Sequence, residues 1–124
     1  MFGGFVYNKT MATSKITIIR GDDVTRQMTF TNADGTPFDL TNYTILFTVK
    51  KRVRDTDADA LIAIEWNTHT NPTQGETTFS LTHNQTDITA GLYTYDFQLR
   101  LNSVVTSTRS GCFEVLQDIT QRIS

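Results

Sequence analysis

The chain lacks several features on which common protein classes depend. It has one cysteine, Cys112, in 124 residues, so no disulfide can form within the chain. It contains no run of 18 apolar residues, which argues against a transmembrane helix. Its first residues have no cationic start, and their short apolar part is broken by glycines, so they do not resemble a signal peptide.

The residue patterns of common catalytic and metal sites are also missing. The two histidines, His69 and His83, fall in polar turns and have no metal-ligand spacing to each other or to Cys112. There is no nucleophile elbow, phosphate-binding loop or dinucleotide fingerprint. We therefore expect no enzymatic activity, cofactor, metal ion or small-molecule substrate, and we expect Cys112 to be a buried, inert thiol.

Charge does not point to nucleic acid or to a membrane surface. The net charge is −2 and the isoelectric point is about 5.5. The basic residues of 50–54 precede the aspartates of "DTDADA" at 55–60, which largely cancel their field. Alternate aspartates are typical of calcium loops, but Ala60 and Trp66 stand where an EF-hand loop needs glycine and glutamate. We interpret this stretch as a solvated charged loop.

Threonine is over-represented, and apolar and polar residues alternate along much of the chain. Threonine is β-branched and favours strands, so the pattern predicts an all-β protein. Short strands separated by turn signals favour an Ig-like antiparallel β-sandwich over residues 15–120. Residues 1–14 form an N-terminal arm or leader in this interpretation, and 121–124 a short C-terminal tail. The expected strands are 15–20, 24–32, 43–51, 61–66, 77–82, 91–101 and 104–117.

The most regular strand follows the turn "ITAG" at residues 88–91. In Ig-like sandwiches a tyrosine at this place bonds its hydroxyl back to the preceding loop. We expect Tyr93 to form this corner and Gly91 to permit a tight approach of the chain. Residues 83–89 are predicted to form a single helical turn that Asn84 caps. Gly111, inside the last strand, suggests a β-bulge.

The order of four segments is similar to a known family. These segments are "RGDDVTRQMTF", "DGTPFDLT", "TAGLYTYDFQL" and "FEVLQDIT". Together they resemble the small Ig-like virion proteins of tailed bacteriophages, in particular the N-terminal domain of the baseplate upper protein family, over roughly residues 15–120. The resemblance implies a structural protein of the virion that assembles in many copies with other virion proteins. It leaves open a place in the tail or baseplate, in the neck or as a capsid decoration.

Aromatic residues are the best candidates for partner contacts, because aromatic side chains dominate interface hot spots. The N-terminal segment is either a flexible leader or an arm that docks on a neighbouring subunit through Phe2, Phe5, Val6 and Tyr7. Trp66, next to the polar turn 67–76, is either part of the core or an exposed anchor. An exposed Trp66 would also suit the alternative function, a carbohydrate-binding module for adhesion to the host.

Overall fold

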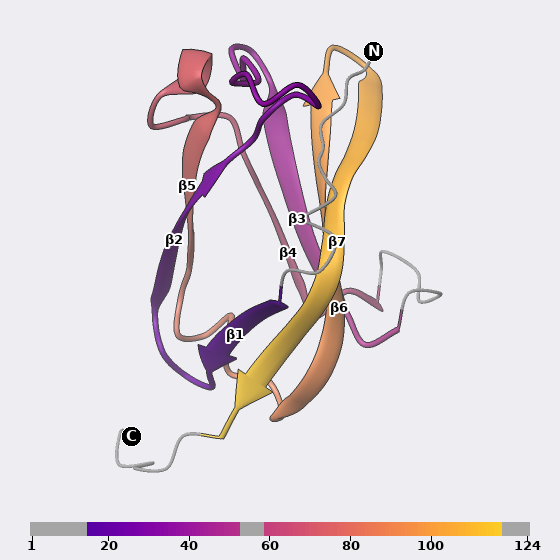
Figure 1. The fold of residues 1–124 in the computed structure, drawn as a ribbon. Helices are drawn as coiled ribbons and strands as arrows, with labels where there is room; N and C mark the ends of the chain where they lie inside the picture. Colours follow the sequence, from indigo (N-terminus) through magenta and orange to yellow (C-terminus); the bar gives the residue numbers. More distant parts are fainter. Residues whose placement is uncertain (1–14, 53–58, 118–124) are drawn as a thin grey trace.

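Seven strands and one short 3-10 turn make up the regular structure within residues 15–52 and 59–117, the part of the chain that the computed structural model describes (Figure 1). The strands belong to two sheets that face each other as a sandwich. The elements are β1 (Lys15–Ile19), β2 (Val24–Thr29), β3 (Thr44–Lys50), β4 (Ile62–Trp66), η3 (Pro72–Gln74), β5 (Glu76–Leu81), β6 (Gly91–Leu101) and β7 (Val104–Leu116).

The larger sheet has the strand order β1-β7-β6-β3-β4, and the smaller one pairs β2 with β5. The predicted all-β sandwich is confirmed, but it is not wholly antiparallel, because β1 pairs with β7 in parallel. Alternation shows which side of a strand is buried and does not show which strands are neighbours, so this pairing could not be predicted from it. The β7-β6-β3-β4 order opposite β2-β5 matches the strand grouping of variable-type immunoglobulin sheets, which supports the Ig-like interpretation.

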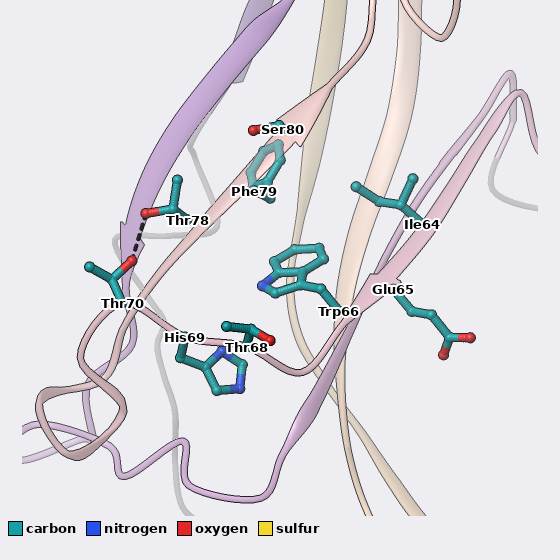
Figure 2. A pocket seen from close by; sticks show the side chains of 9 residues that line it. All are labelled: Ile64, Glu65, Trp66, Thr68, His69, Thr70, Thr78, Phe79 and Ser80. Atoms are coloured by element: carbon teal, nitrogen blue, oxygen red, sulfur yellow. Dashed lines mark hydrogen bonds between the residues drawn. The ribbon is translucent and has the colours of Figure 1, made fainter.

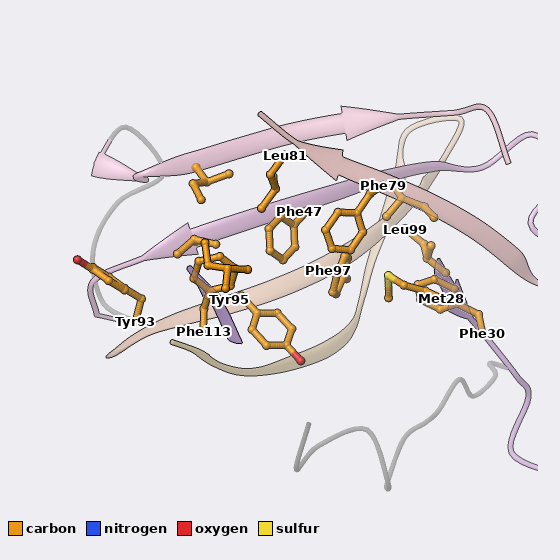
Figure 3. Packing of buried hydrophobic residues seen from close by; sticks show 14 of the residues in the cluster. Met28, Phe30, Phe47, Phe79, Leu81, Tyr93, Tyr95, Phe97, Leu99 and Phe113 are labelled. Carbon is orange, nitrogen blue, oxygen red and sulfur yellow. The ribbon is translucent and has the colours of Figure 1, made fainter. Parts of the chain in front are cut away.

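Phe47, at the middle of β3, is the centre of the core between the sheets (Figure 3). Its ring centroid lies 4.7 Å from that of Phe97 on β6 and 5.1 Å from that of Phe79 on β5. The rings of Tyr95 and Phe113 lie 5.8 and 6.0 Å away. Each aromatic pair contributes about 0.5–1.5 kcal/mol beyond the burial of its surface. One side chain therefore links β3 to β6, to β7 and to the opposite sheet.

The long β6–β7 hairpin contains a bulge at a position other than the predicted one. Gly111 pairs regularly with Tyr95, so the prediction of a bulge there is wrong. The register instead shifts between Phe97, which pairs with residue 109, and Gln98, which pairs with residue 107. Residue 108 has no partner on β6 and is the extra residue of the bulge. Glycine within a strand marks either a bulge or a neighbour that needs room. Gly111 stands opposite the buried Tyr95 in a regular pair.

The turn after β5 is capped by a different residue than predicted. The backbone N–H of Thr82 donates to Oε1 of Gln85 (2.8 Å), and the backbone N–H of Gln85 donates to Oγ1 of Thr82 (3.3 Å). This reciprocal pair is the capping-box pattern, so Thr82 and not Asn84 is the cap. The fully buried Thr86 then donates its hydroxyl to the carbonyl oxygen of Asp22 (2.8 Å), which ties this turn to the one between β1 and β2.

A second turn depends on a glycine that cannot be replaced without a clash. Gly75 has φ +74°, and a Cβ atom there would lie 2.9 Å from the carbonyl oxygen of Phe38 and closer still to that of Phe30. The close approach arises because the N–H of Phe30 donates to the carbonyl oxygen of Gly75 (2.8 Å). The N–H of Leu40 similarly bonds the carbonyl oxygen of Pro72 (2.8 Å). These bonds join η3 to the connection between β2 and β3.

Tyr93 donates its hydroxyl to the carbonyl oxygen of Thr89, four residues earlier in the chain. This is the geometry of a tyrosine corner. The reason proposed for Gly91 is wrong, because a Cβ atom at Gly91 would meet nothing within 4 Å. Glycine is favoured at this position by its φ of +154°, which residues with a side chain rarely adopt.

We expect Tyr93→Phe to lower the free energy of unfolding by roughly 1 kcal/mol, because the carbonyl of Thr89 loses its donor while the buried ring stays in place. Urea denaturation followed by circular dichroism measures the change. Tyr43→Phe is the matched control, since the Tyr43 ring packs against Phe38 and its hydroxyl lies outside the corner. Equal stability of the two variants would show that the corner bond does not stabilise the fold.

Candidate functional site

Of the residues predicted to contact partners, only Trp66 lies in the described part of the chain. Trp66 ends β4 at one edge of the larger sheet, level with Ile45. Tyr93 and Gly91 lie at the opposite end of the sandwich, near the start of β6. The proposed anchors Phe2, Phe5, Val6 and Tyr7 lie outside the described residues, as do residues 53–58 of the charged loop. Trp66 and the corner at Tyr93 are therefore two separate regions of the described sandwich.

A groove of about 470 Å³ opens beside Trp66, between β4, the turn that follows it and β5 (Figure 2). The indole is half-buried and packs on Phe79, with ring centroids 5.5 Å apart. Trp66 therefore lies between its two predicted positions, part of the core on one side and part of a groove wall on the other. The groove is lined by Ile64, Glu65, Trp66, Thr68, His69, Thr70, Thr78, Phe79 and Ser80.

A buried hydroxyl joins this tryptophan to a histidine. Thr77 is fully buried, and its Oγ1 lies 2.8 Å from Nε1 of Trp66 and 2.9 Å from Nδ1 of His69. Nε2 of His69 lies 2.8 Å from the carbonyl oxygen of Tyr43, which can only accept a hydrogen bond. The hydrogen of a neutral ring is therefore on Nε2, and Thr77 donates to Nδ1 while it accepts from Trp66. Every polar atom of this network has a partner.

The network engages the polar groups beside the groove that could otherwise act as a base or a nucleophile. Both ring nitrogens of His69 and the hydroxyl of Thr77 are engaged within the protein, so neither group is available as a base or a nucleophile. The sequence interpretation placed His69 in a polar turn and missed its partner. One feature of the sequence does indicate the network. Thr77 is the one polar residue on the inward face of β5, whose other members are Phe79 and Leu81.

Hydrogen bonds from turn residues hold exposed carboxylates in place. Hydrogen bonds from the side chain and backbone N–H of His83 hold the pKa of Asp23 below its usual value. Thr36 lowers the pKa of Asp34 in the same way. The remaining ion pairs, such as Arg100 with Glu65 (3.0 Å), lie at the surface, where such pairs contribute little. These charges support turns and edges and do not converge on a ligand.

Exposed apolar side chains gather at the two ends of the larger sheet. The first group, which we name the hairpin patch, is Val104 and Val105, exposed by 67% and 50%. The second, the sheet-end patch, lies at the end where β7 finishes and β6 begins. Leu92 is its most exposed member at 64%, next to a hollow of about 480 Å³ that Tyr93 also lines. The sheet-end patch consists of Ile19, Leu61, Leu92 and Leu116.

Cys112 is half-buried, so the prediction of a buried thiol is wrong. It alternates with the inward-facing Phe113 on β7 and therefore lies on the outer face of the sheet. Within residues 15–52 and 59–117 there is no cluster of three metal-ligating side chains. The same residues contain no helix long and apolar enough to cross a membrane.

We expect Thr77→Val to destabilise the protein by about 2 kcal/mol, because the isosteric side chain leaves the Trp66 N–H and the His69 ring without their partner. Chemical denaturation followed by Trp66 fluorescence reports both the stability and the environment of the indole. Thr78→Val is the matched control, since its hydroxyl bonds Thr70 at the surface and its loss should cost at most about 0.5 kcal/mol. A difference below that amount between the variants would contradict the network.

Comparison with known proteins gives the chain its family. The model of the BppU N-terminal domain, the first domain of the baseplate upper protein, matches residues 6–123, which is nearly the whole chain. A search of curated proteins finds no match. The resemblance that four sequence segments indicated is thereby confirmed, over a longer range than those segments covered. The chain belongs to the BppU N-terminal domain family and is a component of the phage virion.

Proposed function

We propose that this chain is a non-enzymatic structural domain of the phage baseplate, which acts by binding neighbouring virion proteins in many copies. The match of the family model to residues 6–123 carries this proposal. The described residues are consistent with it, because the polar groups beside Trp66 bond one another and the exposed apolar surface lies elsewhere.

The sheet-end patch is the best-supported contact surface. It combines exposed leucines and an isoleucine with a surrounding rim of charged residues, among them Arg20, Asp87 and Glu114. An apolar centre with a polar rim is the usual anatomy of a protein interface. The corner at Tyr93 fixes the start of β6, so Leu92 is presented from a rigid strand.

The positions of the two patches favour a ring of identical subunits. The hairpin patch and the sheet-end patch lie at opposite ends of the long β6–β7 hairpin. Two different surfaces on opposite ends of one subunit suit head-to-tail contacts, which close into a ring when the rotation between subunits allows it. The aromatic segment Phe2–Tyr7 would add anchors to such a contact. Homo-oligomerisation through these surfaces is part of the proposal.

Host adhesion through Trp66 is less well supported. A sugar-binding tryptophan offers an open ring face and free polar neighbours. The indole of Trp66 packs on Phe79 and donates its N–H to Thr77. We therefore do not propose carbohydrate binding.

Quantitative mass spectrometry of purified phage particles tests the proposed location. We expect the protein to be present in a copy number that matches, or is a simple multiple of, that of the other baseplate proteins, because closed rings share symmetry. A copy number that follows the major capsid protein would point to a capsid decoration. Absence from the particle would overturn the structural role.

We expect phage that carries Leu92→Asp to incorporate about tenfold less of the protein, since a charge at the centre of an apolar contact removes the affinity of a hot-spot residue. The amount is measured in purified particles against an internal standard. Gln27→Asp, at an exposed position on β2 of the other sheet, is the control, and thermal unfolding verifies that both variants fold. Equal incorporation of the two variants would exclude the sheet-end patch as the contact.

A further inference from the structure

β4 forms one edge of the larger sheet. It pairs with β3 on one side, and no strand within residues 15–52 and 59–117 adds to its other side. Such an edge presents a row of unpaired backbone N–H and C=O groups and is a template for another strand. The sequence of β4, "IAIEW", contains neither the proline nor the lysine with which edge strands often block such pairing. The edge is therefore open to a further strand.

The two faces of β4 differ in chemistry. Ile64 and Trp66 point inward, are half-buried and line the groove between β4 and β5 (Figure 2). Ala63 and Glu65 alternate with them and are exposed on the outer face, where Nη2 of Arg100 donates to the carboxylate of Glu65 (3.0 Å). A strand that pairs with this edge therefore needs apolar side chains on its inward face and polar or small ones on its outer face. β4 itself has this pattern.

The edges of the small sheet are less open than that of β4. Asn71, in the turn after β4, forms a β-bridge with Glu76 and so covers the start of the β5 edge. On β2, Nη2 of Arg26 donates to the carbonyl oxygen of Thr17 (2.6 Å), which ties that strand to β1. Among these edges, β4 combines an open backbone with an uncovered apolar groove beside it.

We propose that a second copy of this chain pairs its β4 antiparallel with the β4 of the first, about a two-fold axis at Ile64. In this register Ile64 lies opposite its counterpart, Ile62 opposite the partner's Trp66, and Ala63 opposite the partner's Glu65. Inward side chains thus meet inward side chains along the whole strand. The two five-stranded sheets form one continuous sheet, and the apolar walls of the two grooves cover each other.

Charge selects this register and this partner. Side chains directly opposite each other on antiparallel strands interact, and like charges in such a pair are destabilising. An axis at Glu65 would also bring the apolar faces together, but it would place two carboxylates opposite each other. With the axis at Ile64, each Glu65 faces the small side chain of Ala63 and keeps its bond to Arg100. The strand is therefore complementary to a copy of itself, which favours a second copy over an unrelated segment.

This contact differs from the proposed head-to-tail contacts in symmetry and in place. It uses the same surface on both subunits and closes at two copies. Leu92 and Val104 lie on β6 and β7, and β3 separates those strands from β4, so one subunit can make both kinds of contact. A single strand edge is a small interface, so we expect the isolated protein to pair weakly. The inference does not depend on where the protein sits in the virion.

Charge substitutions at Ala63 test the register with effects of opposite sign. Ala63→Lys places an ammonium group opposite the partner's Glu65 and should lower the dissociation constant of the dimer several-fold. Ala63→Glu places a like charge there and should raise the constant several-fold, because the pair occurs twice in each dimer. Glu65→Lys added to Ala63→Glu restores opposite charges and should recover the association. Analytical ultracentrifugation of the isolated protein, at concentrations up to the millimolar range, measures the dissociation constant.

Gln27→Lys and Gln27→Glu are the matched controls, because they change the net charge equally at an exposed position on β2 and should leave the association unchanged. Thermal unfolding verifies that every variant folds. An Ala63→Lys protein that stays monomeric at every concentration would overturn the proposal. A dimer whose dissociation constant shifts in the same direction with both charges at Ala63, or does not shift, would show that another surface forms it and would overturn the assignment to β4. Leu92→Asp should leave the β4 dimer intact, so this inference and the proposed head-to-tail contact can fail separately.

Discussion

The contact between the two sheets depends on Phe47. The small sheet has two strands, and a pair of strands alone is at best marginally stable in water. It is held in the fold by the side chains that it buries against the larger sheet, and Phe79 on β5 meets Phe47 directly. Because the same ring also packs on Phe97 and Phe113, the position of β5 is coupled to the β6–β7 hairpin. The surfaces of the hairpin are thus set by a core contact.

Polar contacts fix the edges that this aromatic core leaves open. Between β4 and β5 the chain crosses from one sheet to the other, and the buried hydroxyl of Thr77 joins Trp66 to His69 at that crossing. Beside it, Gly75 lets the backbone approach the carbonyl oxygens of Phe30 and Phe38. At the other end, Thr86 bonds the turn before β2. A different arrangement of these loops would leave a buried polar group without its hydrogen bond, which costs free energy. The hydrogen bonds therefore exclude alternative arrangements of the loops.

The sequence predicted what alternation encodes and missed what depends on long-range pairing. Strand positions and inward-facing residues such as Ile45 and Leu99 follow from a period of two, and the structure buries both. The parallel partner of β1 and the bulge at residue 108 depend on neighbours distant in sequence, which a local pattern does not contain. His69 was assigned to a polar turn because its partners, Thr77 and the carbonyl of Tyr43, become neighbours only when the sheets pack.

These properties also explain how a small sandwich can serve as an assembly unit. A domain whose polar groups bond one another has a fixed shape before it meets a partner. Its surface is already ordered by folding, so binding does not have to supply the entropic cost of ordering it. The apolar residues that remain outside, such as Leu92 and Val104, lie at the ends of β6 and β7, and the register of those strands sets the distance between them. In the proposed ring, contacts at the two ends of this hairpin would transmit the position of one neighbour to the next. The rigidity of the hairpin would then determine whether such a ring can close.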